Sequence, residues 1–127
     1  MDKQIESFDE FWPFYVREHS KKLTRQLHFV GTSLALGCLA TGLLTRQRWL
    51  LFAAPLAGYG PAWFSHFVIE KNRPATFKHP LWSLAADLVM WGKMIAGTMD
   101  DEVAAVLEAE RATQGDDRSA ESDYSVN

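Results

Sequence analysis

The sequence predicts an all-α protein: a small membrane helical bundle with a two-span hairpin, a third apolar helix and flanking interfacial helices. Two long uncharged segments follow each other with only Thr45–Arg48 between them. Polar residues gather towards the two ends of the chain, so the slightly negative mean hydropathy conceals an apolar middle. A chain of 127 residues corresponds to one domain.

The charges divide the chain near residue 99. Residues 1–99 carry eleven basic and seven acidic side chains, a net charge of +4, whereas residues 100–127 carry nine acidic and two basic ones, a net charge of −7. We therefore expect a membrane-embedded helical domain over 1–99. The remainder, 100–127, is expected to form a short helix (about 101–111) and an acidic disordered tail, because its last residues are small and polar.

The first predicted element is a helix over residues 5–24. Ser7 and Glu10 have the spacing of a capping box, and aromatic residues recur on one side at helical spacing. Such a helix lies in a membrane interface or packs on the rest of the domain, and the pattern favours neither. Without the basic start and cleavage site of a secretory signal, the N-terminal residues are expected to belong to the mature protein.

The next two elements are the predicted spans. Leu27–Leu44 has 18 residues and Trp49–Ile69 has 21, and neither contains Asp, Glu, Lys or Arg. A membrane-spanning helix needs about 17–25 mainly apolar residues, so both segments qualify. Small residues crowd the first segment and allow close helix packing. Two buried helices in a soluble bundle are the alternative, but so short a chain would struggle to cover two helices that are apolar all round.

A polar connection, residues 70–78, leads to a third helix from Pro80 to about Met99, which either spans or lies at the interface. The positive-inside rule places the termini of this multi-pass membrane protein in the cytoplasm. The hairpin loop has only Arg46 and Arg48, whereas six basic residues flank the hairpin on the side of its ends: Lys21, Lys22, Arg25, Lys71, Arg73 and Lys78.

The hairpin brings all four histidines to one membrane face, which is then also cytoplasmic. His19 precedes the hairpin, His28 and His66 lie near its two ends, and His79 follows it. Imidazole is the commonest metal ligand in proteins and is scarce inside membrane segments. Four of them in one layer suit a divalent transition metal. His19 and His28 can share a metal only if the chain bends between them, because nine residues of one helix rotate by about 180°. The alternative is that each histidine is a hydrogen-bonded packing residue.

Several polar residues are candidates for the surroundings of this site. Glu70, one helical turn after His66, is a candidate ligand or an orienting partner of a ligating imidazole. Asn72, Arg73 and Lys78 form a polar, basic rim suited to a substrate carboxylate, or simply follow the positive-inside rule. Asp87 is a buried acid that belongs to the site or serves as a structural partner of Lys93.

Other functional classes find little support in the sequence. Cys38, the only cysteine, lies in an apolar run and is expected to be a small core residue. There is no phosphate-binding glycine loop, no Ser-His-Asp pattern and no nucleic-acid patch.

Several motifs together resemble a known family. They are FYVREHSKKLTRQLHFVGT and GYGPAWFSHFVIEKNRPATFKHPLWSLAADLVMW, and they cover roughly residues 7–95. They are similar to a family long known only as a domain of unknown function, whose characterised fungal member is a 2-hydroxy-fatty-acid dioxygenase of the endoplasmic reticulum.

The resemblance implies an enzyme of fatty acid and lipid metabolism: an iron(II)-dependent dioxygenase in which a 2-hydroxy fatty acid reacts with O₂ and loses one carbon, by α-oxidation. It implies Fe(II) as cofactor, the bilayer as surroundings, and His19, His28, His66 and His79 as catalytic iron ligands. Two alternatives stay open. One is a haem protein with His28 and His66 as axial ligands, and the other is a non-catalytic small membrane protein.

Overall fold

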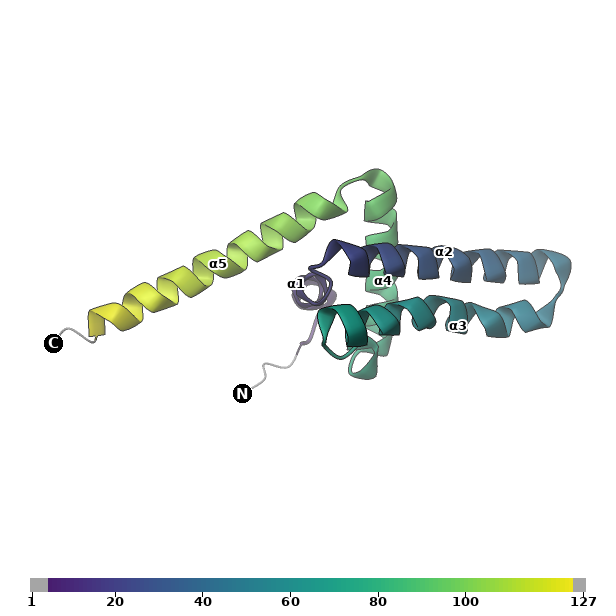
Figure 1. The fold of residues 1–127 in the computed structure, drawn as a ribbon, viewed down its shortest axis with the longest axis horizontal. Coiled ribbons are helices and arrows are strands. Elements are labelled where there is room, and N and C mark those ends of the chain that lie inside the picture. Colours follow the sequence, from purple (N-terminus) through teal and green to yellow (C-terminus); the bar gives the residue numbers. More distant parts are fainter. Residues whose placement is uncertain (1–4, 125–127) are drawn as a thin grey trace.

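The computed structural model describes residues 5–124, with side chains as far as Asp116, and these residues form helices and no strand. The all-α class is therefore confirmed. Figure 1 shows the order of the elements along the chain. They are α1 (Phe8–Glu18), α2 (Lys22–Thr45), α3 (Arg48–Phe64), the π-helix η1 (Ser65–Glu70), the 3₁₀-helix η2 (Ala75–Phe77), α4 (Pro80–Ala96) and α5 (Met99–Tyr124).

Helices α2 and α3 form an antiparallel hairpin (Figure 1). The turn between them uses Arg46 in the left-handed conformation, with φ 56°. The two backbones approach closely where glycines face each other, because a Cβ atom on Gly31 would lie 2.8 Å from the carbonyl oxygen of Gly58. Small residues thus set the spacing of the hairpin, as membrane helix pairs prefer.

One described helix, α2, is long and apolar enough to cross a bilayer. It has 24 residues, whereas α3 has 17 before it changes into the π-helix η1. Length and apolar composition alone are weak evidence of a span, since a core helix can have both. The hairpin itself is present, and its two spans stay a prediction.

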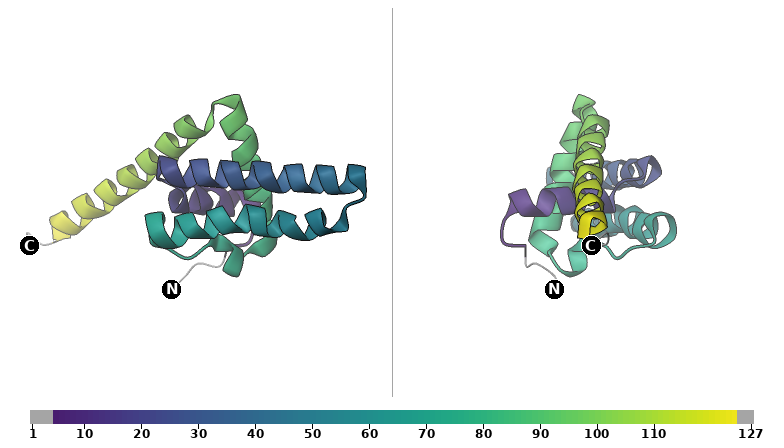
Figure 2. Two further views of the ribbon diagram at one scale, coloured as in Figure 1. Left: turned by 45° about the vertical axis from the view of Figure 1, so that its right-hand side comes forward. Right: turned by 90° about the vertical axis from the view of Figure 1, so that its left-hand side faces the viewer.

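The hydrophobic core lies beside the base of the hairpin rather than within it. Its buried side chains come from α1, η2, α4 and the first turns of α5, and they are Phe11, Tyr15, Val16, Ala75, Ala86, Met90, Met99 and Val103. The distal half of the hairpin extends beyond the other helices (Figures 1 and 2). Large apolar side chains are exposed there: Leu43, Leu44, Trp49, Phe52 and Leu56. Such a surface marks a contact with a membrane or a partner.

The chain turns sharply between α1 and α2, so the helix predicted over 5–24 is divided. Ser7 caps α1 as predicted, accepting a hydrogen bond from the Glu10 amide, but α1 ends at Glu18. Buried Arg25 stabilises the turn, since its Nη1 donates to the carbonyl oxygens of His19 and Ser20. The turn contains neither glycine nor proline, so no signal in the sequence indicated that the predicted helix would end there.

The C-terminal part differs most from its prediction. The third helix, α4, begins at Pro80 as expected. Helix α5, however, continues to Tyr124, beyond the predicted end near Arg111. Its first turns also pack against α1, where the Glu102 carboxylate accepts from Trp12 Nε1 at 2.5 Å and pairs with Lys93 at 2.8 Å. Three of the acidic residues, Asp100, Asp101 and Glu102, occupy the first turn of α5, where negative charge is favourable.

Candidate metal centre

Three of the four histidines meet at the base of the hairpin, and each comes from a different element. His19 lies in the turn after α1, His28 in the second turn of α2, and His66 in η1. The Nε2 atom of His19 is 3.0 Å from that of His28 and 3.0 Å from that of His66. All three residues are buried, with exposed fractions of 1%, 4% and 2%. The chain bends between His19 and His28, which is the condition for these two histidines to share a metal ion.

The rings of His19 and His28 have their protons fixed by backbone acceptors. The Nδ1 atom of His19 is 2.6 Å from the carbonyl oxygen of Tyr15, and that of His28 is 2.9 Å from the carbonyl oxygen of Thr24. Because a carbonyl oxygen can only accept, both Nδ1 atoms carry a hydrogen. Both Nε2 atoms therefore present a lone pair to the other rings.

A side chain fixes the proton of the third ring. The Nδ1 atom of His66 is 2.7 Å from Oδ1 of Asn72. The amide of Asn72 is oriented by Glu18, since Nδ2 donates to the Glu18 carbonyl oxygen at 3.3 Å and to its carboxylate. Oδ1 therefore accepts from His66, whose Nε2 is unprotonated as well.

The three unprotonated nitrogens form a donor set that a metal ion would complete. Burial, reinforced by the rings of His28 and His66, lowers the pKa of His19 well below its usual range, so this imidazole is neutral at pH 7. The candidate ligand atoms all lie within 4.8 Å of one another. At a metal–nitrogen distance of about 2.1 Å, nitrogens 3.0 Å apart subtend about 90° at a shared ion. The residues present thus fit a divalent transition metal.

His79 is not brought to this cluster. It is half-buried just before α4, where its ring lies edge-on to Phe11 and stacks on Trp82, with centroid separations of 5.5 and 5.6 Å. It is absent from the group of side chains whose ligand atoms converge. Its neighbours are aromatic, so its surroundings differ from those of the other three.

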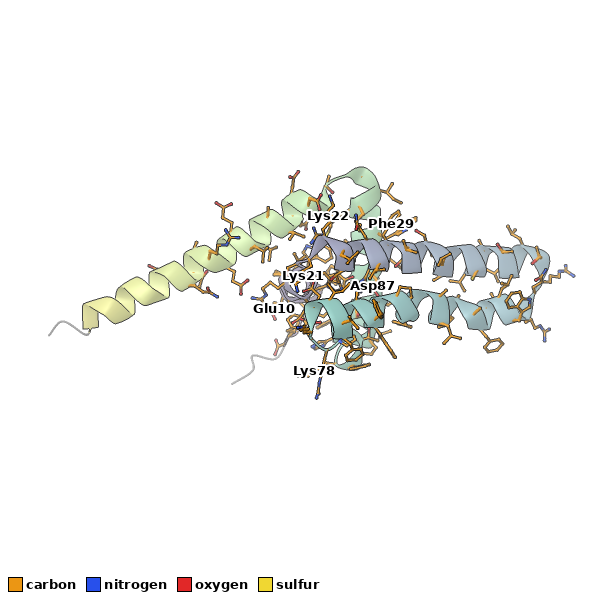
Figure 3. The ribbon with its side chains drawn as sticks, in the orientation of Figure 1. Glu10, Lys21, Lys22, Phe29, Lys78 and Asp87 are labelled. Atoms are coloured by element: carbon orange, nitrogen blue, oxygen red, sulfur yellow. The ribbon has the colours of Figure 1, made fainter. Side chains whose placement is uncertain are left out.

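The predicted polar rim is divided, because Asn72 contacts His66 whereas its two basic residues lie away from the histidines. Glu70 accepts from the backbone amide of Lys21 at 2.9 Å, and thereby ties the end of η1 to the start of α2. Arg73 and Lys78 are exposed, and neither lines the cavity next to the histidines. Figure 3 shows the Lys78 side chain extending away from the body.

Asp87 does lie beside the histidines. It projects from α4 at the base of the hairpin (Figure 3), and its carboxylate accepts a hydrogen bond from the hydroxyl of Tyr15. The ring of Tyr15 stacks on His19 with centroids 4.0 Å apart. Burial raises the pKa of Asp87 to about 6, against the effect of the Tyr15 hydrogen bond. Burial also raises the pKa of Tyr15, which therefore remains a donor.

Two cavities with shared lining residues adjoin the cluster. A polar one of about 10 Å³, roughly the space of one water, is lined by the three histidines together with Trp63, Thr76 and Ser83 among others. A larger one of about 380 Å³ extends along the hairpin from His28. The indole Nε1 of Trp63 is buried without a hydrogen-bond partner among the described residues. An unpaired buried donor beside the candidate metal site is available to a bound molecule.

Sequence reasoning missed the residues that orient the rings. Tyr15 lies in the N-terminal helix whose aromatic residues were predicted to share one side, but it was not assigned to the site, and the role of Arg25 was not anticipated. The two backbone acceptors lie four residues before their histidines, a spacing that every helical histidine has, so the sequence holds no specific signal for them. Ser65, 3.3 Å from Nδ1 of His28, is a further contact of this kind.

The profile of one known family matches residues 5–99 of the chain, and its description is 2-hydroxy-palmitic acid dioxygenase Mpo1-like. No curated protein and no solved structure matches the chain. The matched residues include the three clustered histidines, Tyr15, Asn72 and Asp87. The match covers well over half of the chain and agrees with the resemblance carried by the histidine motifs, so the chain belongs to the Mpo1-like family.

Proposed function

We propose that this protein is an iron(II)-dependent dioxygenase that shortens 2-hydroxy fatty acids by one carbon. The observation that carries the proposal is the convergence of three buried imidazoles, each with a hydrogen on Nδ1 and a lone pair on Nε2. Family membership supports the substrate class and the dioxygenase reaction.

The number of ligands supports a catalytic metal rather than a structural zinc, because structural zinc sites are closed by four protein ligands and this cluster offers three. Three protein ligands leave positions open, as in non-haem iron oxygenases. Iron(II) held there would supply the binding and reduction of O₂.

The remaining residues are proposed to hold the substrate and keep water out. The indole N–H of Trp63 is free to donate to the hydroxy-carboxylate end, and Tyr15 holds the Asp87 carboxylate beside the same cavity. The bond between C1 and C2 breaks, C2 becomes the new carboxyl carbon, and C1 leaves as CO₂. O₂ accepts the four electrons: one oxygen atom enters the new carboxyl group and the other leaves as water.

We further propose that the hairpin spans the membrane twice, with the histidine site and both termini at the cytoplasmic face. The exposed apolar side chains of its distal half support insertion, and the basic residues beside its base support the orientation. Single cysteines at Glu6 and Gln47 in a Cys38→Ala background test this. An impermeant maleimide added to intact cells should label position 47 and spare position 6; labelling of position 6 alone would reverse the topology.

The haem alternative has little geometric support. A haem needs its two axial imidazoles on opposite faces of a porphyrin, and the Nε2 of His19 lies 3.0 Å from both His28 and His66, where that porphyrin would have to lie. A non-catalytic role remains the second candidate, and metal content together with turnover separates it from the enzyme.

The direct test uses purified protein loaded with iron(II) under nitrogen and then exposed to O₂ with 2-hydroxypalmitate. We expect the substrate to disappear and the acid with one carbon fewer to form. Protein carrying zinc in place of iron is the matched control and should be inactive. Failure of the iron-loaded protein to consume hydroxy acids of any chain length contradicts the proposed function.

A further inference from the structure

We propose that the 380 Å³ cavity between α2, α3 and α4 binds the acyl tail of the substrate, and that Leu39 and Leu51 close its far end and so limit the chain length. This inference rests on the proposed function, because it assigns the tail of the same substrate to a particular surface.

The cavity follows the seam of the hairpin. On α2 it is lined by one stripe of residues at helical spacing, beginning at His28 and ending at Leu39. On α3 the lining runs in the opposite direction, from Ala62 beside the histidines to Leu51. Because the helices are antiparallel, Leu39 and Leu51 are the lining residues furthest from the metal centre.

The two ends of the cavity differ in chemistry, as the two ends of a fatty acid do. The end at the base contains His28, Tyr59 and Asp87, which also line the small polar cavity, so the two cavities share a wall. Beyond Thr32 the lining is apolar, and it ends in leucines. A molecule with a polar head and an unbranched apolar tail matches this order of surroundings.

The dimensions fit a fatty acid tail. The eleven helical steps from His28 to Leu39 span about 16 Å at 1.5 Å per residue. With carbon–carbon bonds of about 1.5 Å, an extended alkyl chain advances about 1.3 Å per carbon, so this length holds about twelve carbons. A volume of 380 Å³ also lies within the usual range for ligand cavities, about 300–1,000 Å³.

The sides of the seam are only partly covered along its length, because the lining residues Leu39, Leu84 and Leu88 are exposed. Helix α4 covers the lower part through Leu84 and Leu88, whereas the distal half of the hairpin has no other described helix beside it (Figure 2). The tail therefore enters sideways with its methyl end towards the hairpin tip. A bilayer lipid would use the same opening, and the second experiment below separates it from the fatty acid.

The first experiment measures kcat/KM for 2-hydroxy acids of 10 to 18 carbons with wild type and with Leu39→Trp. The larger side chain removes space for about two methylenes, and each lost methylene contact corresponds to about a fourfold factor. We expect kcat/KM for the longest acids to fall about tenfold and that for the shortest to remain within twofold. Leu43→Trp, one turn further along α2 and outside the cavity, is the matched control and should leave the profile unchanged.

Loss of activity at every length, with an unchanged ratio between long and short acids, overturns the assignment of Leu39. An equal shift with Leu43→Trp does so too, because the effect would then come from the hairpin surface. Leu51→Ala serves as a second variant that adds space, and it should raise the relative rate with the longest acids.

The second experiment does not need turnover. Iron-loaded protein in lipid nanodiscs under nitrogen is mixed with a 16-carbon 2-hydroxy acid that carries a diazirine near its methyl end, and is then irradiated. Labels are expected on the segments around Leu39 and Leu51, and an excess of unlabelled hydroxy acid should prevent them. Labels confined to the outer face of α3, near Phe52 and Leu56, contradict the inference. Labels competed equally by phospholipid indicate a lipid site.

The two experiments distinguish the two proposals. If the protein is labelled in the seam but consumes no hydroxy acid, the tail site stands and the proposed reaction fails. If it consumes hydroxy acids with a length profile that Leu39→Trp leaves unchanged, the reaction stands and the tail site fails.

Discussion

The base of the hairpin contains two kinds of histidine environment within a short distance of each other. The rings of His19, His28 and His66 each have an acceptor at Nδ1 and face one another with Nε2, whereas His79 lies between Phe11 and Trp82. All four are near the same end of the hairpin. The comparison teaches that proximity to the cluster is not enough: the three histidines that could share a metal ion are those with a hydrogen-bond acceptor at Nδ1.

The largest expected effect concerns the ligands themselves. Replacement of His19, His28 or His66 by alanine removes one of three nitrogens, and we expect metal affinity to fall more than about a hundredfold. This estimate follows from about 10–16 kcal/mol shared among four ligands in structural zinc sites. The measurement is the metal content of each purified variant after dialysis.

His79→Ala is the matched control for these variants. It should retain stoichiometric metal, because its ring packs among aromatic side chains and not in the cluster. Loss of metal in this variant, or its retention in all three others, would overturn the distinction between the two environments.

Acidification should act on the three-histidine environment before it acts on the rest of the fold. The lowered pKa of His19 means that protons bind more readily to the unfolded chain than to the metal-free folded protein. The free energy of unfolding of metal-free protein should therefore be level above about pH 6.5, the ordinary pKa of histidine, and should fall below it. Because the raised pKa of Asp87 acts in the opposite direction below about pH 6, the urea titrations from pH 5 to 8 use the Asp87→Asn variant, in which a flat profile would contradict a neutral buried cluster.

Replacement of Asn72 is expected to lower metal affinity by a smaller factor. Asn72→Leu removes the acceptor that orients His66, and we expect metal affinity to fall about 10–100-fold. Glu70→Gln makes a suitable comparison, since Glu70 bonds to the Lys21 amide and not to a histidine. Equal losses of affinity in both variants would mean that the whole π-helix, and not the Asn72 contact, holds the ring.

Trp63→Phe is expected to have the smallest effect. It removes the unpaired indole N–H and keeps most of the aromatic surface, so metal content should be unchanged. We expect KM for a 2-hydroxy fatty acid to rise up to about tenfold, as the loss of one hydrogen bond implies. An unchanged KM would show that the substrate does not use this donor.

Hydropathy and motif spacing predicted the helical class, the hairpin and the start of α4, because these depend on patterns of many residues. The break after Glu18 and the length of α5 were not predicted. The break is stabilised by hydrogen bonds from the Arg25 side chain to backbone carbonyl oxygens, and no helix-ending residue type in the sequence indicates it. For the site, the sequence named His19, His28, His66, Asn72 and Asp87. It could not separate His79 from the others, because the direction of a ring depends on tertiary neighbours.

The close contact of Gly31 with Gly58 has a consequence for the metal centre. Gly31 is three residues after His28, and the facing stretch of α3 continues directly into the π-helix that bears His66. The distance between the two backbones therefore sets the separation of the His28 and His66 rings. A single methyl group added at Gly31 would push the two helices apart, and would thereby separate His28 from His66 without touching either ring.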